Sequence, residues 1–238
     1  MTCILALDTS TERLVVALDV DGAQTVVDED GGARASARIV PLAMELLARA
    51  GRAPADLDAV AFGRGPGAFT GLRIACAVAQ GLAWGAGCPV LPVGSLLIVA
   101  EDARAQLAPG GEPFDTWVAM DARMDEAYAA AYAWRGEAWR VVREPALAPL
   151  DVLHAWWREA APAVIAGSAL DAFGDRLDSA GARRVAVAHD RAAALLRLAR
   201  RAWAAGEAVD ASLALPIYLR DKVALTTAER AQRTGAVA

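Results

Sequence analysis

An α/β fold built from two related domains is predicted by three features of the sequence. Apolar segments of strand length alternate with segments of helical periodicity, which is typical of α/β proteins. An apolar strand that ends in aspartate, a polar turn and a returning strand that reaches a glycine occur twice, over residues 4–22 and 116–136. A stretch rich in proline and glycine, 109–113, lies between the copies and is typical of a linker. We expect one domain over residues 1–108 and a related, reduced domain over 114–238; the alternative is that the two hairpins resemble each other by coincidence.

The individual elements follow from local signals in chain order. Residues 4–8 and 14–20 are apolar segments joined by a Thr/Ser-rich turn, which predicts a β-hairpin. A helix over 36–50 ends at Gly51, and Pro41 either kinks this helix or marks its true start. The remaining predicted strands are 24–28, 58–63, 89–93, 116–121, 127–134 and 163–167, and the remaining predicted helices are 70–84, 95–107 and 192–205.

The composition limits the kinds of partner. Of 238 residues, 56% are hydrophobic and only 22% are charged, so we expect a large core and some apolar surface covered by another molecule. The net charge of −5 argues against broad contact with a phosphate backbone, so any role with nucleic acid is expected to be indirect. Three scattered cysteines, Cys3, Cys76 and Cys88, indicate reduced thiols. Because the N-terminus lacks a basic region and the apolar run over 74–100 is broken by proline and glycine, the sequence predicts a cytoplasmic protein without a membrane span.

Side chains that usually carry catalysis are scarce. The two histidines, His154 and His189, lie in separate segments and lack metal-ligand spacing, as do the cysteines. No G-x-S-x-G nucleophile elbow is present. The sequence therefore predicts neither a catalytic residue nor a metal site in this chain.

One turn has the composition of a phosphate-facing site. Asp8, Thr9 and Ser10 follow an apolar strand, and a carboxylate in that position can hold Mg²⁺ beside a phosphate. The alternative is that Asp8 caps the turn through hydrogen bonds to its own backbone. For Asp121, which ends the corresponding strand of the second copy, we expect a structural role.

The glycine-rich segment Gly63–Arg73 joins a strand to a helix. Such a turn offers backbone N–H groups to a phosphate, but a P-loop requires a lysine and the only lysine of the chain is Lys222. A dinucleotide loop is also disfavoured, because Pro66 removes one backbone donor. We therefore favour glycines that supply the positive φ angles of a tight turn over glycines that bind phosphate directly.

The helices over 36–50 and 70–84 carry more apolar surface than one sheet can cover. Their charged and polar residues fall on narrow stripes, which predicts a second surface packed against them. The alternative is that the two helices lie side by side on one sheet face and cover each other. The predicted partner-contact residues are Ile39, Val40, Ala43, Met44, Leu47, Leu72, Arg73, Cys76, Ala79 and Gln80.

Four motifs together resemble one protein family. These are Leu5–Ser10, Ile39–Leu42, Gly63–Arg73 and Met120–Arg123, and the combination is similar to the TsaB (YeaZ) family of bacterial tRNA threonylcarbamoyladenosine synthesis. The resemblance is strong over residues 1–100, and weak beyond 136 except at Pro216–Arg220. It implies an actin, sugar kinase and Hsp70-like (ASKHA) fold in which the second of two duplicated domains is reduced.

The same resemblance implies a set of partners. It implies pairing with the catalytic paralogue TsaD through the two helices, a third partner in the ATPase TsaE, and contact with tRNA only through the complex. It also implies ATP or ADP with Mg²⁺ in the complex rather than on this chain. Separately, the apolar surface of the two helices favours a homodimer when the chain is alone, although the sequence does not decide this. TsaD carries a His-x-x-x-His metal site on the helix matching 36–50, where this chain has no histidine, so that chemistry is not expected here.

The leading hypothesis is a noncatalytic scaffold that pairs with and activates a TsaD-like transferase. The Asp8–Ser10 turn is then a vestige of a phosphate site. The alternative is a nucleotide-dependent phosphotransferase of the same fold, in which that turn is active.

Overall fold

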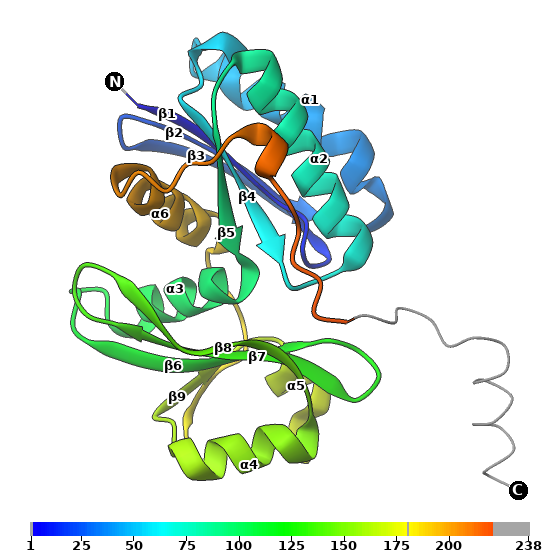
Figure 1. Ribbon diagram of the computed structural model, residues 1–238, viewed down its shortest axis with the longest axis vertical. Coiled ribbons are helices and arrows are strands. Elements are labelled where there is room, and N and C mark those ends of the chain that lie inside the picture. The colour runs from blue at the N-terminus through cyan, green and yellow to red at the C-terminus, as the bar shows by residue number, and fades with distance from the viewer. Residues whose placement is uncertain (1, 180, 221–238) are drawn as a thin grey trace, which may run out of the picture.

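A computed structural model describes residues 2–179 and 181–220, and it contains two five-stranded sheets (Figure 1). The first sheet has the order β3-β2-β1-β4-β5, and the second, taken from its other end, has the order β8-β7-β6-β9-β10. In each sheet the first three strands in sequence are antiparallel and the last two run parallel to the first. The same topology therefore occurs twice, as the repeated hairpins predicted.

The elements have the following bounds. The strands are β1 Cys3–Asp8, β2 Arg13–Val20, β3 Ala23–Asp30, β4 Ala59–Gly65, β5 Val90–Gly94, β6 Phe114–Asp121, β7 Glu126–Trp134, β8 Trp139–Pro149, β9 Val164–Ala166 and β10 Arg183–Val185. The helices are α1 Ala35–Arg49, α2 Phe69–Ala86, α3 Ser95–Leu107, α4 Leu150–Ala160, α5 Ala169–Phe173 and α6 Arg191–Ala204. Short 3-10 turns lie at Gly32–Arg34, Pro54–Asp56, Gly174–Arg176 and Ala211–Leu213.

Helices α1 and α2 lie side by side on one face of the first sheet (Figure 1). Ile39 and Leu46 of α1 and Ala79 of α2 pack with Leu7 and Phe62 of the strands in one buried cluster. Their inner faces are thus covered by this chain itself, which is the arrangement weighed as the alternative to a partner surface. Pro41 lies inside α1 and neither begins nor ends it.

The face of each sheet that is turned toward the other sheet is covered by the helix that follows that other sheet (Figure 1). Helix α3 follows β5 but packs on the second sheet, where Val99 and Ala103 meet Val118. Helix α6 follows β10 but packs on the first sheet, where Leu195 meets Ile4. The predicted division at 108 and 114 separates the two sheets. Residues 191–204, which lie in the predicted second domain, pack on the first sheet.

The α3–α6 contact is held by a buried glutamate. Glu101 on α3 accepts hydrogen bonds at 2.9 Å from both Nε and Nη2 of Arg104, and at 2.6 Å from Arg197 Nε on α6. Trp139 Nε1 donates a further bond at 3.0 Å. Burial alone would raise the pKa of Glu101, but the bonds from the arginines and the tryptophan outweigh it and lower the pKa to about 2.

The second unit is reduced where the first carries α2. Helix α5 occupies the position between β9 and β10 that α2 occupies between β4 and β5, yet it has 5 residues where α2 has 18. Within the described residues, no helix combines the length and apolar character needed to cross a bilayer.

Candidate functional site between the two sheets

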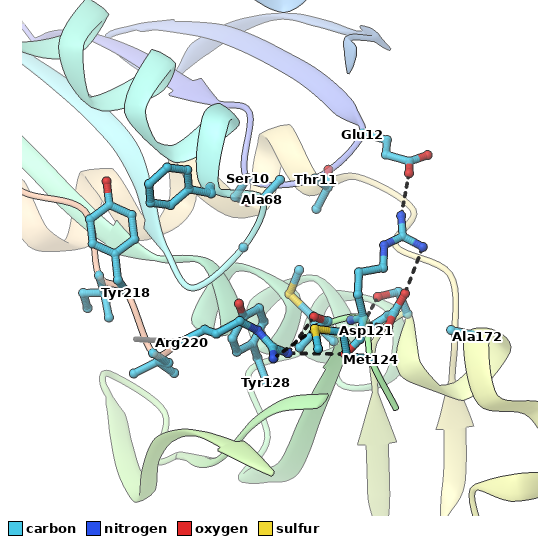
Figure 2. A pocket seen from close by; sticks show the side chains of 18 of the residues that line it. Ser10, Thr11, Glu12, Ala68, Asp121, Met124, Tyr128, Ala172, Tyr218 and Arg220 are labelled. Carbon is cyan, nitrogen blue, oxygen red and sulfur yellow. Dashed lines mark hydrogen bonds and ion pairs between the residues drawn. The ribbon is translucent and has the colours of Figure 1, made fainter. Parts of the chain in front are cut away.

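A cavity of about 620 Å³ lies where the β1–β2 turn faces the β6–β7 turn (Figure 2). Helix α2 begins at its upper wall and the segment 217–220 closes one side. Its floor is mostly apolar, with Met120, Met124 and Tyr128 contributed by the second sheet and its turn. The other lining residues are Ser10, Thr11, Glu12, Arg13, Gly67, Ala68, Phe69, Asp121, Ala122, Arg123, Ser168, Ala172, Ile217, Tyr218, Leu219 and Arg220.

The glycines of segment 63–73 pack against the β1–β2 turn. A Cβ on Gly63 would overlap the carboxyl group of Asp8, one on Gly67 would overlap the carbonyl of Ser10, and one on Gly71 would overlap the carbonyl of Thr9. None of these three glycines has a positive φ angle; in this segment only Gly65 does, at 107°. The prediction that these glycines supply positive φ angles is therefore wrong for three of the four. Gly63, Gly67 and Gly71 instead allow two backbone segments to approach closely.

Asp8, Thr9 and Ser10 are all buried, and their polar groups are paired within the chain. Oδ1 of Asp8 accepts the backbone N–H of Ser10 at 2.9 Å, which is the capping role weighed as the alternative for this residue. Oδ2 of Asp8 accepts Arg191 Nε at 2.6 Å, and Arg191 Nη2 donates to Ser10 Oγ at 2.8 Å. Thr9 Oγ1 donates to the carbonyl of Gly71 at 2.6 Å.

These residues do not fit a Mg²⁺-phosphate group. Both carboxylate oxygens of Asp8 are engaged, and Arg191 occupies the side of Asp8 and Ser10 that a cation would need. On the second unit, Ser168 Oγ accepts the N–H of Asp121 at 3.2 Å, and a Cβ on Gly167 would overlap the carbonyl of Ala119. The Gly167–Ser168 turn is thus packed against strand β6. Within the described residues, no group of three or more His, Cys, Asp or Glu side chains is arranged to hold a metal ion.

The β6–β7 turn has an unusual backbone. Arg123, Met124 and Asp125 all have φ angles near +60°, the left-handed region that side chains other than glycine rarely adopt. Arg220 Nη2 donates to the carbonyls of Ala122, at 3.0 Å, and Arg123, at 3.3 Å. Its guanidinium also pairs with Glu126 at 2.7 Å, so one side chain satisfies the acceptors of the turn from outside it.

The segment 211–220, which we call the strap, runs along α2 before it reaches this turn (Figure 1). The carbonyl of Ala214 accepts Gln80 Nε2 at 3.0 Å, and the Cys76 thiol lies 3.3 Å from the same oxygen. Further along, Arg73 Nε donates to Tyr218 Oη at 3.0 Å while its guanidinium covers the ring of Phe69. The strap therefore connects residues 69–80 of α2 with the cleft.

The predicted partner-contact residues divide into two groups. Ile39, Ala43, Leu47, Leu72, Cys76 and Ala79 are buried in the core of this chain, because α1 and α2 use those faces against the sheet. These six side chains therefore offer little free surface in this chain, and their contact with a partner stays a prediction. Val40, Met44, Arg73 and Gln80 reach the surface to different extents.

Two residues of the site were not predicted as such. Arg191 begins α6 and contacts Asp8, 183 positions earlier in the chain, and no local pattern marks that contact. Arg220 lies in the Pro216–Arg220 segment that the family resemblance already singled out, but the resemblance gave it no role. An interdomain ion pair, Arg123 with Glu12 at 2.9 Å, was also not predicted.

Comparisons with known proteins place this geometry in a family. A family model described as "tRNA N6-adenosine threonylcarbamoyltransferase" (TsaD) matches residues 23–164. The chain is 34% identical over 231 residues to the tRNA threonylcarbamoyladenosine biosynthesis protein TsaB of Escherichia coli, covering 93% of this chain and 96% of that protein. It is 44% identical over 125 residues to the protein of that name from Haemophilus influenzae, about half of each chain.

A solved structure agrees with these sequence matches. YeaZ from Pseudomonas aeruginosa superposes with a TM-score of 0.79 at 40% identity, covering 92% of this chain and all of that one. The duplicated two-sheet topology is that of the ASKHA fold. The chain belongs to the TsaB (YeaZ) family of tRNA threonylcarbamoyladenosine biosynthesis proteins.

Proposed function

We propose that this chain is a noncatalytic subunit that pairs with a TsaD-like paralogue and activates it. The reaction of the complex is then N6-threonylcarbamoylation of the adenosine next to the tRNA anticodon. Family membership supports the pathway, and the surface formed by α1, α2 and the strap supports the pairing.

The observation that carries the proposal is a set of exposed apolar side chains distributed along that surface. Trp84 on α2 is 75% exposed, and Leu213 and Leu215 of the strap are 64% and 67% exposed. Val40 of α1 and Tyr218 of the strap are about two-fifths exposed. Half of the large hydrophobic residues exposed in the described part of the chain thus lie on this one surface, which is typical of a protein interface.

Small residues on α2 make this surface suitable for a partner helix. Ala77, Gly81 and Gly85 are exposed and lie four residues apart, so they form a shallow stripe along the helix. A Cβ on Gly81 or Gly85 would meet nothing within 4 Å, which shows that the chain itself does not require glycine there. A helix with larger side chains can approach closely along such a stripe, because the separation of packed helices depends on the side chains between them.

The remaining assignments follow from the charge and the cleft. We assign ATP or ADP with Mg²⁺ to the complex, with a TsaE-like ATPase as third component, because Asp8 and Ser10 are already paired with Arg191. We assign tRNA contact to the partners, since the net charge of −5 is unfavourable for phosphate backbones. A cytoplasmic location fits this assembly.

The phosphotransferase alternative is favoured by one observation, a cavity of about 620 Å³, which is large enough for a small molecule. Calorimetric titration of the isolated chain with Mg-ATP separates the two proposals. Saturable heat with one-to-one stoichiometry supports the phosphotransferase, and its absence supports the scaffold.

The pairing itself is tested with Gly81→Arg and Trp84→Ala. Arginine is a good helix former and position 81 is open, so Gly81→Arg is expected to fold normally while its side chain obstructs the stripe. Ala155→Arg, on the exposed side of α4, is the matched control. In a calorimetric titration with the TsaD-like paralogue, we expect both α2 variants to bind at least tenfold more weakly and the control to bind as the wild type does. Unchanged affinity of both α2 variants would exclude this surface as the interface.

A further inference from the structure

Three side chains form a closed polar cluster at the base of the β1–β2 turn. Asp8 is 1% exposed, Ser10 is 2% exposed and the Arg191 side chain is 6% exposed. Arg191 bridges the other two: Nε binds the carboxylate at 2.6 Å and Nη2 binds the serine hydroxyl at 2.8 Å. A carboxylate this deeply buried requires a compensating positive charge, so the cluster depends on the guanidinium.

We propose that Arg191 is a built-in counter-ion that takes the place of a divalent cation at this turn. A carboxylate and a hydroxyl that converge on one point are ligands that suit Mg²⁺, and here a planar guanidinium satisfies both at once. The β1–β2 turn thereby keeps its conformation without metal or nucleotide. This inference concerns the turn alone and stands independently of the proposed pairing.

The fold delivers Arg191 to this position through the N-terminus of α6. Asp190 caps the helix by accepting the N–H of Ala193 at 2.8 Å. Asp102 of α3 accepts the N–H groups of His189, at 3.1 Å, and Asp190, at 2.8 Å. The backbone at the start of α6 is thus held in place, which puts the Arg191 guanidinium within reach of Asp8.

The surroundings of the cluster explain why removing Arg191 should expose a cation site. Arg191 also lines a second cavity, of about 450 Å³, together with Thr11, Asp28 and Asp102. Without the guanidinium, the Asp8 carboxylate and the Ser10 hydroxyl would face this space. A hydrated divalent cation is then the chemical species that best replaces the lost charge.

The test measures thermal unfolding of the full chain with and without MgCl₂. Arg191→Ala is expected to lower Tm, and Mg²⁺ is expected to restore about 2–4 °C in this variant and nothing in the wild type. Arg200→Ala is the matched control, because Arg200 lies on the same helix and pairs with a buried aspartate, Asp19, at 3.2 Å. Its loss should lower Tm without creating a Mg²⁺ response.

Two further variants show whether Asp8 is the cation ligand. The double variant Asp8→Asn/Arg191→Ala should lose the Mg²⁺ response. Arg191→Lys keeps a positive charge beside Asp8, so this variant should fold and its Tm should not respond to Mg²⁺. It is the variant to measure if Arg191→Ala is too unstable to purify. A Mg²⁺ response in the wild type or in Arg191→Lys would overturn the proposal, as would one that persists in the double variant.

Discussion

Thr9 and Gly71 lie so close together that residue 71 cannot carry a side chain. Thr9 Oγ1 donates to the Gly71 carbonyl at 2.6 Å, and a Cβ at position 71 would overlap the carbonyl oxygen of Thr9. The atom in the way is backbone and cannot rotate aside. The contact couples the start of α2 to the β1–β2 turn.

Gly71→Ala is therefore expected to destabilise the protein by about 2–3 kcal/mol, because the two backbones must separate. Gly81→Ala is the matched control on the same helix and should stabilise by about 0.5–1 kcal/mol, since position 81 is open and alanine favours helix. Urea unfolding of both variants measures the difference. Equal stability of the two would contradict the close approach described here.

Glu101 predicts a specific loss of stability in acid. Its pKa in the folded state is about 2, below the ordinary value of 4.5, so its contribution is complete above pH 4.5 and is lost as pH falls toward 2. The shift corresponds to about 3 kcal/mol of unfolding free energy. Unfolding in urea at a series of pH values measures this loss.

Glu101→Gln leaves the arginines around position 101 without their carboxylate and should cost about 3–5 kcal/mol at neutral pH. The stability gap between this variant and the wild type should narrow as pH falls from 4.5 to 2. Glu137→Gln, at an exposed position, is the control and should show no such gap. A gap of constant size across that pH range would show that the carboxylate charge is not what stabilises the α3–α6 contact.

The apolar surface of α1, α2 and the strap predicts self-association of the isolated chain. We expect sedimentation velocity to show a concentration-dependent dimer for the wild type, because exposed Trp84 and its neighbours find a second copy when the partner is absent. Gly81→Arg should shift the protein to monomer, and Ala155→Arg should not. A dimer that persists in Gly81→Arg would place self-association on another surface.

The hydrogen bonds of Arg220 predict that this side chain keeps the β6–β7 turn rigid. In Arg220→Met, the carbonyls of Ala122 and Arg123 lose their donor, so amide hydrogen exchange over residues 121–126 should accelerate while the sheets remain protected. Met124→Gly should stabilise the wild-type protein by about 1 kcal/mol, because glycine adopts the φ of 59° at this position at little cost. Unchanged exchange in Arg220→Met would show that the turn is held by its own residues.

The sequence predicted this architecture well where periodicity and turns decide it. The helix predicted over 95–107 has the same bounds as α3, and the repeated hairpin predicted the duplicated sheet. The position of α6 was not predictable, because its pattern shows which face is buried but not against which sheet. The strands and helices of 139–185, other than β9, were also not predicted, since that stretch lacks a sustained period.

Several residues of the site could be predicted from the sequence, but the contacts between them could not. The sequence identified the Asp8 turn and the glycine segment as notable. It did not show that their two backbones pack against each other, because the residues in contact are more than 50 positions apart in the chain. The left-handed turn at 123–125 uses no glycine, so no turn rule marks it. For α1 and α2, composition showed excess apolar surface, and only the packed structure shows which of their residues are exposed.

The exchange of α3 and α6 between the two sheets has a consequence for how the chain folds. Neither half can complete its core from its own residues, because each requires the helix that follows the other. A fragment ending at residue 108 would leave the sheet face under α6 bare, and folding should therefore be cooperative over the whole chain, in a single transition, with the halves stable only together.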